Sequence, residues 1–372
     1  MSVTTNKINV SLLDTKRQNA PHRDKILAAM TEVFDSGQYI LGPKVTQLEN
    51  EIAAYCETKH AIGVSSGTDA LIIALMGLDI GPGDEVITSP FTFFATLGSI
   101  TRVGATPVFV DIDPYTFNID PKQIEAKITD KTKAIIPVHL FGQVADMTAI
   151  MAIAEKNNLR VIEDGAQAIG AKHNGQQAGS FGDVGCFSFF PSKNLGGCGD
   201  GGIVTTNSSE LYEKMKILRV HGSKPKYYHK LIGGNFRLDP LQAVILSIKL
   251  PHLNQQHADR QAHAAVYNSE LHESITAPVV AKESFMIYNQ YSILSKTRDA
   301  LQEYLGENGI SSAIYYPVPL HLQECFSELK HKEGDFPISE RIAKQILSIP
   351  IYPEMTKDER AHVIKTINRF SN

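Results

Sequence analysis

Lys193 is the residue whose surroundings most suggest chemistry. It ends the run SFFPSK (188–193) and is followed by a glycine-rich stretch that reaches Gly202. Glycine loses much conformational entropy on folding, so this density indicates close backbone approach or unusual backbone angles. A lysine sheltered from water can lose its proton and form a Schiff base. The alternative is a surface hairpin turn with an incidental lysine.

Two further segments carry groups of complementary chemistry. The segment SSGTDAL (65–71) lies directly between a predicted strand and a predicted helix, where backbone N–H groups at Gly67 and the hydroxyl of Thr68 could hold a phosphate. The segment EDGAQ (163–167) ends an apolar strand, so that Asp164 could point into a cleft. Each has a plainer interpretation, as a helix-capping turn or a solvated acidic pair.

The conjunction of the three segments fits pyridoxal 5′-phosphate (PLP). That cofactor needs a phosphate cradle, a lysine for the imine, and an acid that keeps the pyridine nitrogen protonated. Gly67 and Thr68, Lys193 and Asp164 supply these parts. Phe93 follows a strand end and could stack on the flat ring, although it could equally belong to the core.

The elements that must position these residues alternate between strand and helix. Short β-rich runs are expected at 61–65, 85–89, 107–111, 133–138, 159–163, 184–190 and 202–206. Helices are expected at 24–36, 45–56, 69–78, 145–156, 208–219 and 239–250. This alternation predicts an α/β fold with a mostly parallel sheet, and ligands of such sheets bind beyond the carboxyl ends of the strands.

The chain is long enough for two domains. Beyond about residue 255 it becomes more polar, with helices expected at 256–273, 297–309 and 339–348. We therefore expect a large domain over 1–254, which includes an N-terminal helical segment, and a smaller C-terminal domain over 255–372.

Composition narrows the class of protein. The net charge of −4 does not favour binding to nucleic acid or to an anionic membrane, both of which attract positively charged proteins. The four cysteines lie far apart without C-x-x-C spacing, so neither a metal site nor a disulfide framework is expected. With no apolar run of signal-peptide or membrane-span length, the sequence predicts a cytoplasmic protein.

The same motifs, with several others, resemble a known family from about Leu13 to the C-terminus. The additional motifs are YILGP (39–43), PGDEVI (82–87), GNFRLD (234–239) and YPxPL (316–320). Together they resemble the DegT family of PLP-dependent sugar-nucleotide aminotransferases, of fold type I. The resemblance implies an aspartate-aminotransferase-like fold, with a mostly parallel seven-stranded sheet flanked by helices and a smaller C-terminal α+β domain.

The resemblance also implies roles at the cofactor. Lys193 would carry PLP as a Schiff base and shuttle a proton, while Asp164 would pair with the ring nitrogen. The other cofactor contacts that it implies come from Gly67, Thr68 and Ser188 at the phosphate, Phe93 and Gln167 at the ring, and Asn235 of a neighbouring subunit. The implied assembly is a homodimer with shared active sites.

The implied reaction is a ping-pong transfer of the amino group of L-glutamate to a keto-sugar nucleotide. Residues 219–237 most resemble enzymes that aminate C3 of UDP-2-acetamido-2-deoxy-3-oxo-D-glucuronate, for amino sugars of surface polysaccharide such as O-antigen. Residues expected to bind substrate are Tyr39, His221, Tyr228, His229, Arg237, Tyr315, Tyr316 and His321. Arg237 could hold a uronate carboxylate or a diphosphate, or instead form a structural salt bridge with Asp239 or another acidic residue. His321 departs from that subgroup.

Other functions stay open at this point. One is amination of a dTDP- or UDP-linked keto-6-deoxyhexose at C3 or C4. A cysteine desulfurase would need a reactive cysteine on a mobile loop, and Cys325 has no such context. A non-catalytic regulatory protein on the same fold should have lost Lys193 or Asp164, and the family's dehydratase branch has histidine in place of the lysine.

Overall fold

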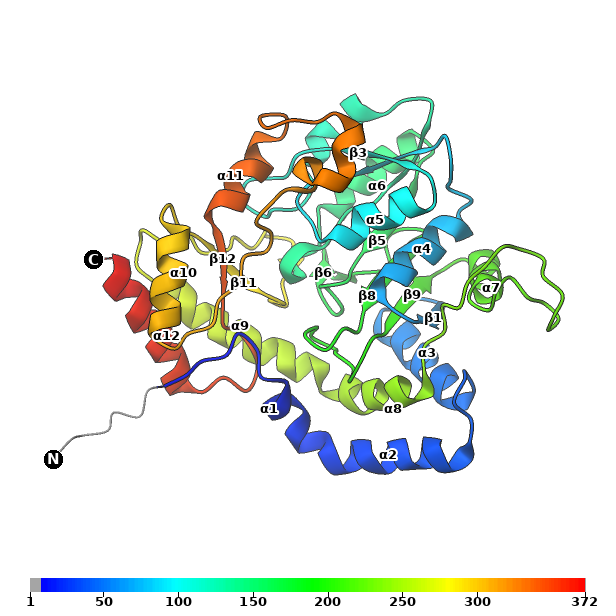
Figure 1. Cartoon of the computed structure of the whole chain (residues 1–372), viewed down its shortest axis with the longest axis horizontal. Coiled ribbons are helices and arrows are strands. Elements are labelled where there is room, and N and C mark those ends of the chain that lie inside the picture. Colours follow the sequence, from blue (N-terminus) through cyan, green and yellow to red (C-terminus); the bar gives the residue numbers. More distant parts are fainter. Residues whose placement is uncertain (1–7, 372) are drawn as a thin grey trace.

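A seven-stranded sheet forms the centre of the molecule (Figure 1). We describe residues 8–371 of a computed structural model. The strand order is β1-β9-β8-β5-β4-β2-β3, and only β9 runs antiparallel to its neighbours. The strands are β1 (His60–Val64), β2 (Glu85–Thr88), β3 (Thr106–Phe109), β4 (Thr132–Ile135), β5 (Arg160–Asp164), β8 (Val184–Ser188) and β9 (Gly202–Thr206). The predicted α/β fold with a mostly parallel sheet is confirmed.

Helices cover both faces of the sheet because successive strand residues point to opposite sides. In β1, Ala61 packs into one core and Ile62 into the other. The core around Ala61 is shared with α3 (Pro43–Tyr55), α6 (Met147–Lys156) and α8 (Pro240–Lys249), and α2 (Arg23–Ser36) lies along α8 (Figure 1). The core around Ile62 is shared with α4 (Gly67–Gly77), α5 (Phe94–Arg102) and α7 (Ser209–Leu218).

Local signals fix where these helices begin and end. The Ser66 side chain accepts a hydrogen bond from the backbone N–H of Asp69 and so caps α4, and Asp146 caps α6 in the same way. Gly37 ends α2 in the left-handed conformation, with φ of 65°. These caps explain why the expected helices agree with the observed ones within about two residues.

The C-terminal part contains a two-stranded sheet, and its apolar side chains form one core with residues of the larger part such as Phe91 and Phe141. Its elements are α9 (Leu253–Glu270), β11 (Tyr291–Leu294), α10 (Arg298–Glu307), α11 (Pro337–Gln345), β12 (Ile346–Ile349) and α12 (Lys357–Ser371). The helix expected at 339–348 is therefore wrong at its end. Residues 346–349 form β12 because every side chain of this apolar run is buried against β11 and its neighbours.

The N-terminal segment packs on this C-terminal part. Val10 exchanges backbone hydrogen bonds with Gly309 and Ser311, and its side chain lies in the C-terminal core. A small third sheet joins β6 (Lys172–His173) and β7 (Gln176–Gln177) to β10 (Ser284–Phe285). The short helix α1 (Thr15–Asn19) leads into α2. Val10 therefore packs beside the C-terminal elements, and the division into domains at residue 254 stays a prediction.

None of the helices within residues 8–371 is long and apolar enough to cross a membrane.

Candidate active site

A cavity of about 450 Å³ opens at the carboxyl ends of the parallel strands. The end of β5, the end of β8 and the start of α4 all contribute to its wall. Nine of the residues expected at the site line it: Gly67, Thr68, Phe93, Asp164, Gln167, Ser188, Lys193, Tyr315 and Tyr316. The parallel sheet therefore brings together segments that are up to about 250 residues apart in sequence.

The start of α4 forms an anion cradle at one end of the cavity. The first backbone N–H groups of a helix have no partners within the helix, and the helix dipole favours negative charge there. A Cβ atom added to Gly67 would lie 2.7 Å from Cβ of Ser188, so only glycine leaves the two segments this close. Thr68 is exposed in the cavity wall, and Ser188 at the end of β8 also lines the cavity. The cradle suits a phosphate.

Lys193 lies half-buried in the same cavity. Its segment is held by backbone bonds that include Lys193 N–H to Phe190 O at 2.8 Å and Gly197 N–H to Phe189 O at 2.8 Å. Desolvation lowers the pKa of Lys193 to about 8, although the charge of Asp164 opposes the shift. A lysine of this kind is partly neutral near neutral pH, as a nucleophilic amine must be.

Asp164 and Glu163 are adjacent in sequence but differ in role. Asp164 faces the cavity, and burial raises the pKa of its carboxyl while hydrogen bonds from Thr96 and the Ala166 N–H, and the charge of Lys193, oppose that shift. Glu163 points away and is buried, where it accepts backbone N–H bonds from 179, 181 and 182 at 2.7–2.8 Å. It also lies 2.9 Å from His139 Nε2. Only Asp164 is available to a ligand.

Aromatic and amide groups complete the wall beside Phe93. Gln167 Oε1 accepts a hydrogen bond from the backbone N–H of Phe141 at 2.6 Å, and its Nε2 donates to the Tyr316 hydroxyl at 3.1 Å. The Phe93 ring is 56% exposed and lies with its centroid 6.1 Å from that of Tyr316. The amide is therefore fixed in one orientation, and the Phe93 face is free to stack on a planar ligand.

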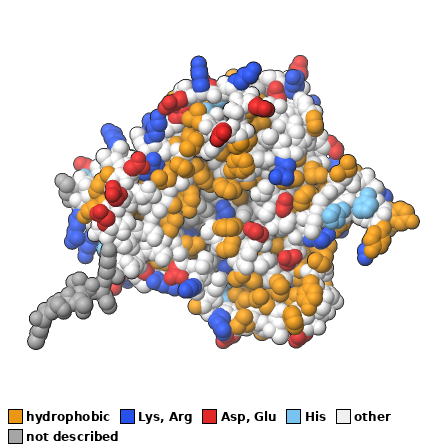
Figure 2. Space-filling model, viewed as in Figure 1, with side chains coloured by type: hydrophobic (Ala, Val, Ile, Leu, Met, Phe, Trp, Pro, Cys, Tyr) orange, Lys and Arg blue, Asp and Glu red, His pale blue; other side chains and the backbone are white. Residues whose placement is uncertain are grey.

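Several residues expected to bind substrate lie outside this cavity in the single chain. Tyr39 is exposed and donates its hydroxyl hydrogen to Phe34 O at 2.9 Å. The segment after α7 projects from the molecule, and in Figure 2 its pale blue histidines and orange side chains stand out at the right edge. The expected residues that lie on this projecting segment are His221, Tyr228 and His229, and Asn235 and Arg237 follow it towards α8.

The contacts of Arg237 and Asn235 bear on the roles that the sequence analysis expected for them. Arg237 is half-buried, and its Nε has no hydrogen-bond partner among residues 8–371; no salt bridge to Asp239 forms among those residues. Asn235 is exposed, and a backbone bridge joins it to Val220. Neither residue meets its own chain's cavity, so a role for Asn235 or Arg237 at an active site stays a prediction.

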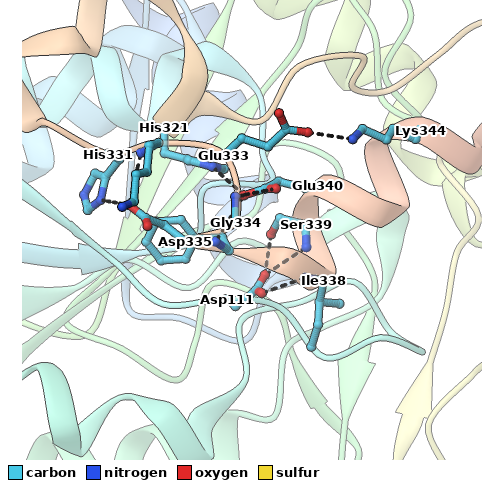
Figure 3. Close-up of polar contacts among 12 residues, drawn as sticks. Asp111, His321, His331, Glu333, Gly334, Asp335, Ile338, Ser339, Glu340 and Lys344 are labelled. Atoms are coloured by element: carbon cyan, nitrogen blue, oxygen red, sulfur yellow. Dashed lines mark hydrogen bonds and ion pairs between the residues drawn. The ribbon is translucent and has the colours of Figure 1, made fainter.

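The expectation that His321 contacts substrate needs correction. Its side chain is 2% exposed and lies outside the cavity, with Nε2 3.1 Å from Glu340 Oε1 (Figure 3). Glu340 also accepts backbone N–H bonds from Gly334 and Phe336. The histidine packs edge-on against Phe109 and Phe336, and burial lowers its pKa. His321 is a core residue because the chain after Pro319 folds back over β3 and α5.

The sequence analysis did not identify the groups that support Asp164, which are the two threonine hydroxyls of Thr92 and Thr96 and the buried pair of His139 with Glu163. Thr96 lies 2.7 Å from Asp164 Oδ2, and Thr92 Oγ1 lies 3.0 Å from Thr96 Oγ1. His139, which pairs with Glu163, donates its backbone N–H to Asp164 O. The four-residue spacing of two threonines at a helix start was the available signal, but nothing local tells which strand that helix faces. Gln290 also lines the cavity unpredicted.

The fold and this site together define an enzyme that uses PLP. The cradle at Gly67, the buried Asp164 carboxylate and the lysine with a lowered pKa match the phosphate, ring nitrogen and aldehyde of that cofactor. Residues 21–368 match the DegT/DnrJ/EryC1/StrS aminotransferase family. The chain belongs to this family, whose members are PLP-dependent, and it is an aminotransferase.

Relatives cover almost the whole chain. A pleiotropic regulatory protein of Geobacillus stearothermophilus is 52% identical, over 98% of this chain and 99% of its own length. A UDP-N-acetyl-3-dehydro-α-D-glucosamine 3-aminotransferase of Acidithiobacillus ferrooxidans is 46% identical, over 98% and 99%. A UDP-2-acetamido-2-deoxy-3-oxo-D-glucuronate aminotransferase of Pseudomonas aeruginosa is 44% identical, over 92% and 95%.

Solved structures agree with the fold in detail. The S. venezuelae protein DesV, crystallised in complex with a ketimine intermediate, superposes with a TM-score of 0.96 at 42% identity, over 98% of this chain and 99% of that one. NtdA of Bacillus subtilis, with bound cofactor PMP, superposes with a TM-score of 0.91 at 32% identity, over 98% and 86%. The relatives and the solved structures therefore support the same fold and activity class, and the names of two relatives specify a keto sugar nucleotide as their substrate.

Proposed function

We propose that this enzyme moves the amino group of L-glutamate to C3 of a UDP-linked 2-acetamido-2-deoxy-3-keto sugar. The two UDP-sugar relatives, at 46% and 44% identity, are named for 3-keto substrates of this kind and differ at C6, which is a hydroxymethyl group in one and a carboxylate in the other. We retain the 3-oxo-D-glucuronate as the first candidate, with the amino sugar destined for surface polysaccharide made from cytoplasmic precursors.

The observation that carries this proposal is the single cavity that joins Lys193, Asp164 and the cradle at Gly67. When bound, PLP accepts the amino group of the donor and acts as an electron sink. Lys193 takes and returns the proton at the substrate carbon, because a partly neutral amine can act both as base and, once protonated, as acid. With the cofactor bound, Asp164 would hold the proton on the ring nitrogen, and Gln167 would be available to the ring oxygen.

We propose that Arg237 binds the carboxylate of a uronate substrate and so gives the enzyme its specificity at C6. Its guanidinium retains an unpartnered Nε within the described residues and is the kind of group that binds a carboxylate in bidentate fashion. Because it lies outside the cavity of its own chain, we propose that it acts with Asn235 in a homodimer. Exposed apolar side chains on the projecting segment support such a dimer: Tyr227 is 79% exposed, Tyr228 70% and Ile232 92%.

Mass spectrometry of products from a panel of keto-sugar nucleotides tests the substrate. The panel contains UDP-linked 3-keto N-acetylglucosamine, the 3-oxo-glucuronate, and dTDP- and UDP-linked 3- and 4-keto-6-deoxyhexoses. We expect the mass change of amination for the UDP-linked 3-keto sugars. Preferred amination of a 6-deoxy sugar would overturn the proposal in favour of the alternative stated above.

The variant Arg237→Ala tests the C6 group separately. It should weaken use of the uronate and leave the neutral 3-keto sugar unaffected. Equal loss with both sugars would show that Arg237 does not read the carboxylate. The Geobacillus relative is named a regulatory protein. If this chain had a purely regulatory role, no sugar of the panel would be aminated.

A further inference from the structure

Two buried threonines form a hydrogen-bonded chain that ends on Asp164. Thr96 Oγ1 lies 2.7 Å from Asp164 Oδ2, and Thr92 Oγ1 lies 3.0 Å from Thr96 Oγ1. Thr96 is 0% exposed and Thr92 is 2% exposed, so water does not compete for these bonds. Each hydroxyl has one hydrogen; when Asp164 is ionised, Thr96 donates to the carboxylate and Thr92 donates to Thr96.

The position of the chain ties it to the cofactor site. Thr92 and Thr96 flank the start of α5, and Phe93, which faces the cavity, lies between them. The Thr96 backbone N–H donates to Phe93 O at 3.2 Å, which fixes the turn. The other carboxylate oxygen of Asp164 accepts only the longer 3.2 Å bond from the Ala166 N–H among described residues. Thr96 therefore makes the shortest bond to Asp164.

We propose that Thr96 is a positioning residue that orients the Asp164 carboxylate and favours its ionised form, with Thr92 orienting the Thr96 hydroxyl. This inference rests on the proposed role of Asp164 at the ring nitrogen. A hydroxyl that donates to a buried carboxylate stabilises the anion, which burial alone would disfavour. The remaining titratable groups around Asp164 are Lys193, His139, Cys186 and Tyr316.

The test uses the holoenzyme with PLP labelled with ¹⁵N in the ring. The ¹⁵N shift reports ring protonation directly, without turnover. In the variant Thr96→Val, which keeps the side-chain shape, the ring nitrogen should lose its proton at lower pH than in the wild type. The rate constant of the glutamate half-reaction should fall about tenfold to a hundredfold with KM for glutamate unchanged, the size expected for one charge-assisted hydrogen bond.

Matched variants separate positioning from general damage. Thr96→Ser keeps the hydroxyl and should restore the wild-type titration, and Thr92→Val should shift it in the same direction but less. Thr206→Val is the control: Thr206 is 2% exposed, its hydroxyl donates to Asp183 O at 2.7 Å, and it pairs with His60 at the opposite end of the sheet. It should leave the ¹⁵N titration unchanged.

A wild-type ¹⁵N titration in folded Thr96→Val protein would overturn the inference. If Thr96→Val does not fold, Thr92→Val decides, because an unshifted titration there also overturns it. Asp164→Asn distinguishes the underlying role: if that variant leaves ring protonation unchanged, the proposed role of Asp164 is wrong. If it abolishes ring protonation while Thr96→Val has no effect, only the role of Thr96 is wrong.

Discussion

The pKa of Lys193 gives a prediction about how the apoprotein takes up its cofactor. Burial lowers this pKa from 10.5 to about 8. At pH 7.5 about a quarter of the Lys193 side chains are then neutral, against about one in a thousand at the ordinary pKa. Only the neutral amine attacks the PLP aldehyde, so the reactive fraction at this pH is roughly 200-fold larger than the ordinary pKa would allow, and uptake should be faster.

Stopped-flow absorbance of apoprotein mixed with PLP measures this rate as a function of pH. Because the neutral amine is the reactive form, the rate should rise with pH, with its midpoint near 8. Asp164→Asn removes a negative charge that raises the pKa of Lys193, so the midpoint should move to lower pH. The same titration with N-acetyl-lysine methyl ester in place of protein corrects for ionisation of PLP itself. A midpoint near 10.5, or an upward shift in Asp164→Asn, would refute the reasoning.

Three further predictions follow from contacts in the fold. Gly67→Ala places a methyl group 2.7 Å from Ser188 Cβ and forces the two segments apart, so the melting temperature should fall and equilibrium dialysis of the folded variant should show PLP affinity reduced by tenfold or more (about 1.4 kcal/mol); unchanged affinity would exclude the cradle. His321→Gln leaves Glu340 with a weaker partner inside the core and should lower the free energy of unfolding in urea by about 1–3 kcal/mol, whereas a raised KM for sugar without lost stability would restore a substrate role. The pair with Arg17 lowers the pKa of Glu359 to about 2. The pair therefore stabilises the folded state above about pH 4.5, and this contribution disappears as the pH falls through 2. The stability difference between wild type and Glu359→Gln should vanish over that interval, and a difference that persists at lower pH would contradict the assignment.

Much of the large domain follows from its sequence. Strand residues such as Ala61 and Ile62 alternate between two cores, and capping residues such as Ser66 mark where helices begin. Once the strands are known to be parallel, their carboxyl ends must meet at one edge, which is why Asp164 and Lys193 could be assigned to one site. Local signals led to Gly67, Thr68, Asp164 and Lys193, whereas the expectations for Ser188 and Gln167 came from the family resemblance.

The features that the sequence analysis did not predict depend on contacts between segments that are distant in sequence. The apolar run at 346–349 becomes a strand only because β11 lies beside it. His321 has the sequence context of a surface histidine, yet the chain around it folds back against Phe109 and buries it. Thr96 belongs to α5, a helix that the sequence-based expectations omitted, and its partner is 68 residues away. No local pattern identifies such a partner.

The central claim is that Lys193 binds the cofactor covalently. Borohydride reduction of the protein after incubation with PLP, followed by peptide mass mapping, tests it most directly. We predict one pyridoxyl group per chain, on Lys193, and loss of that label when L-glutamate is added before reduction. A label on another lysine, or a Lys193 peptide that stays unmodified, would contradict the assignment of this site.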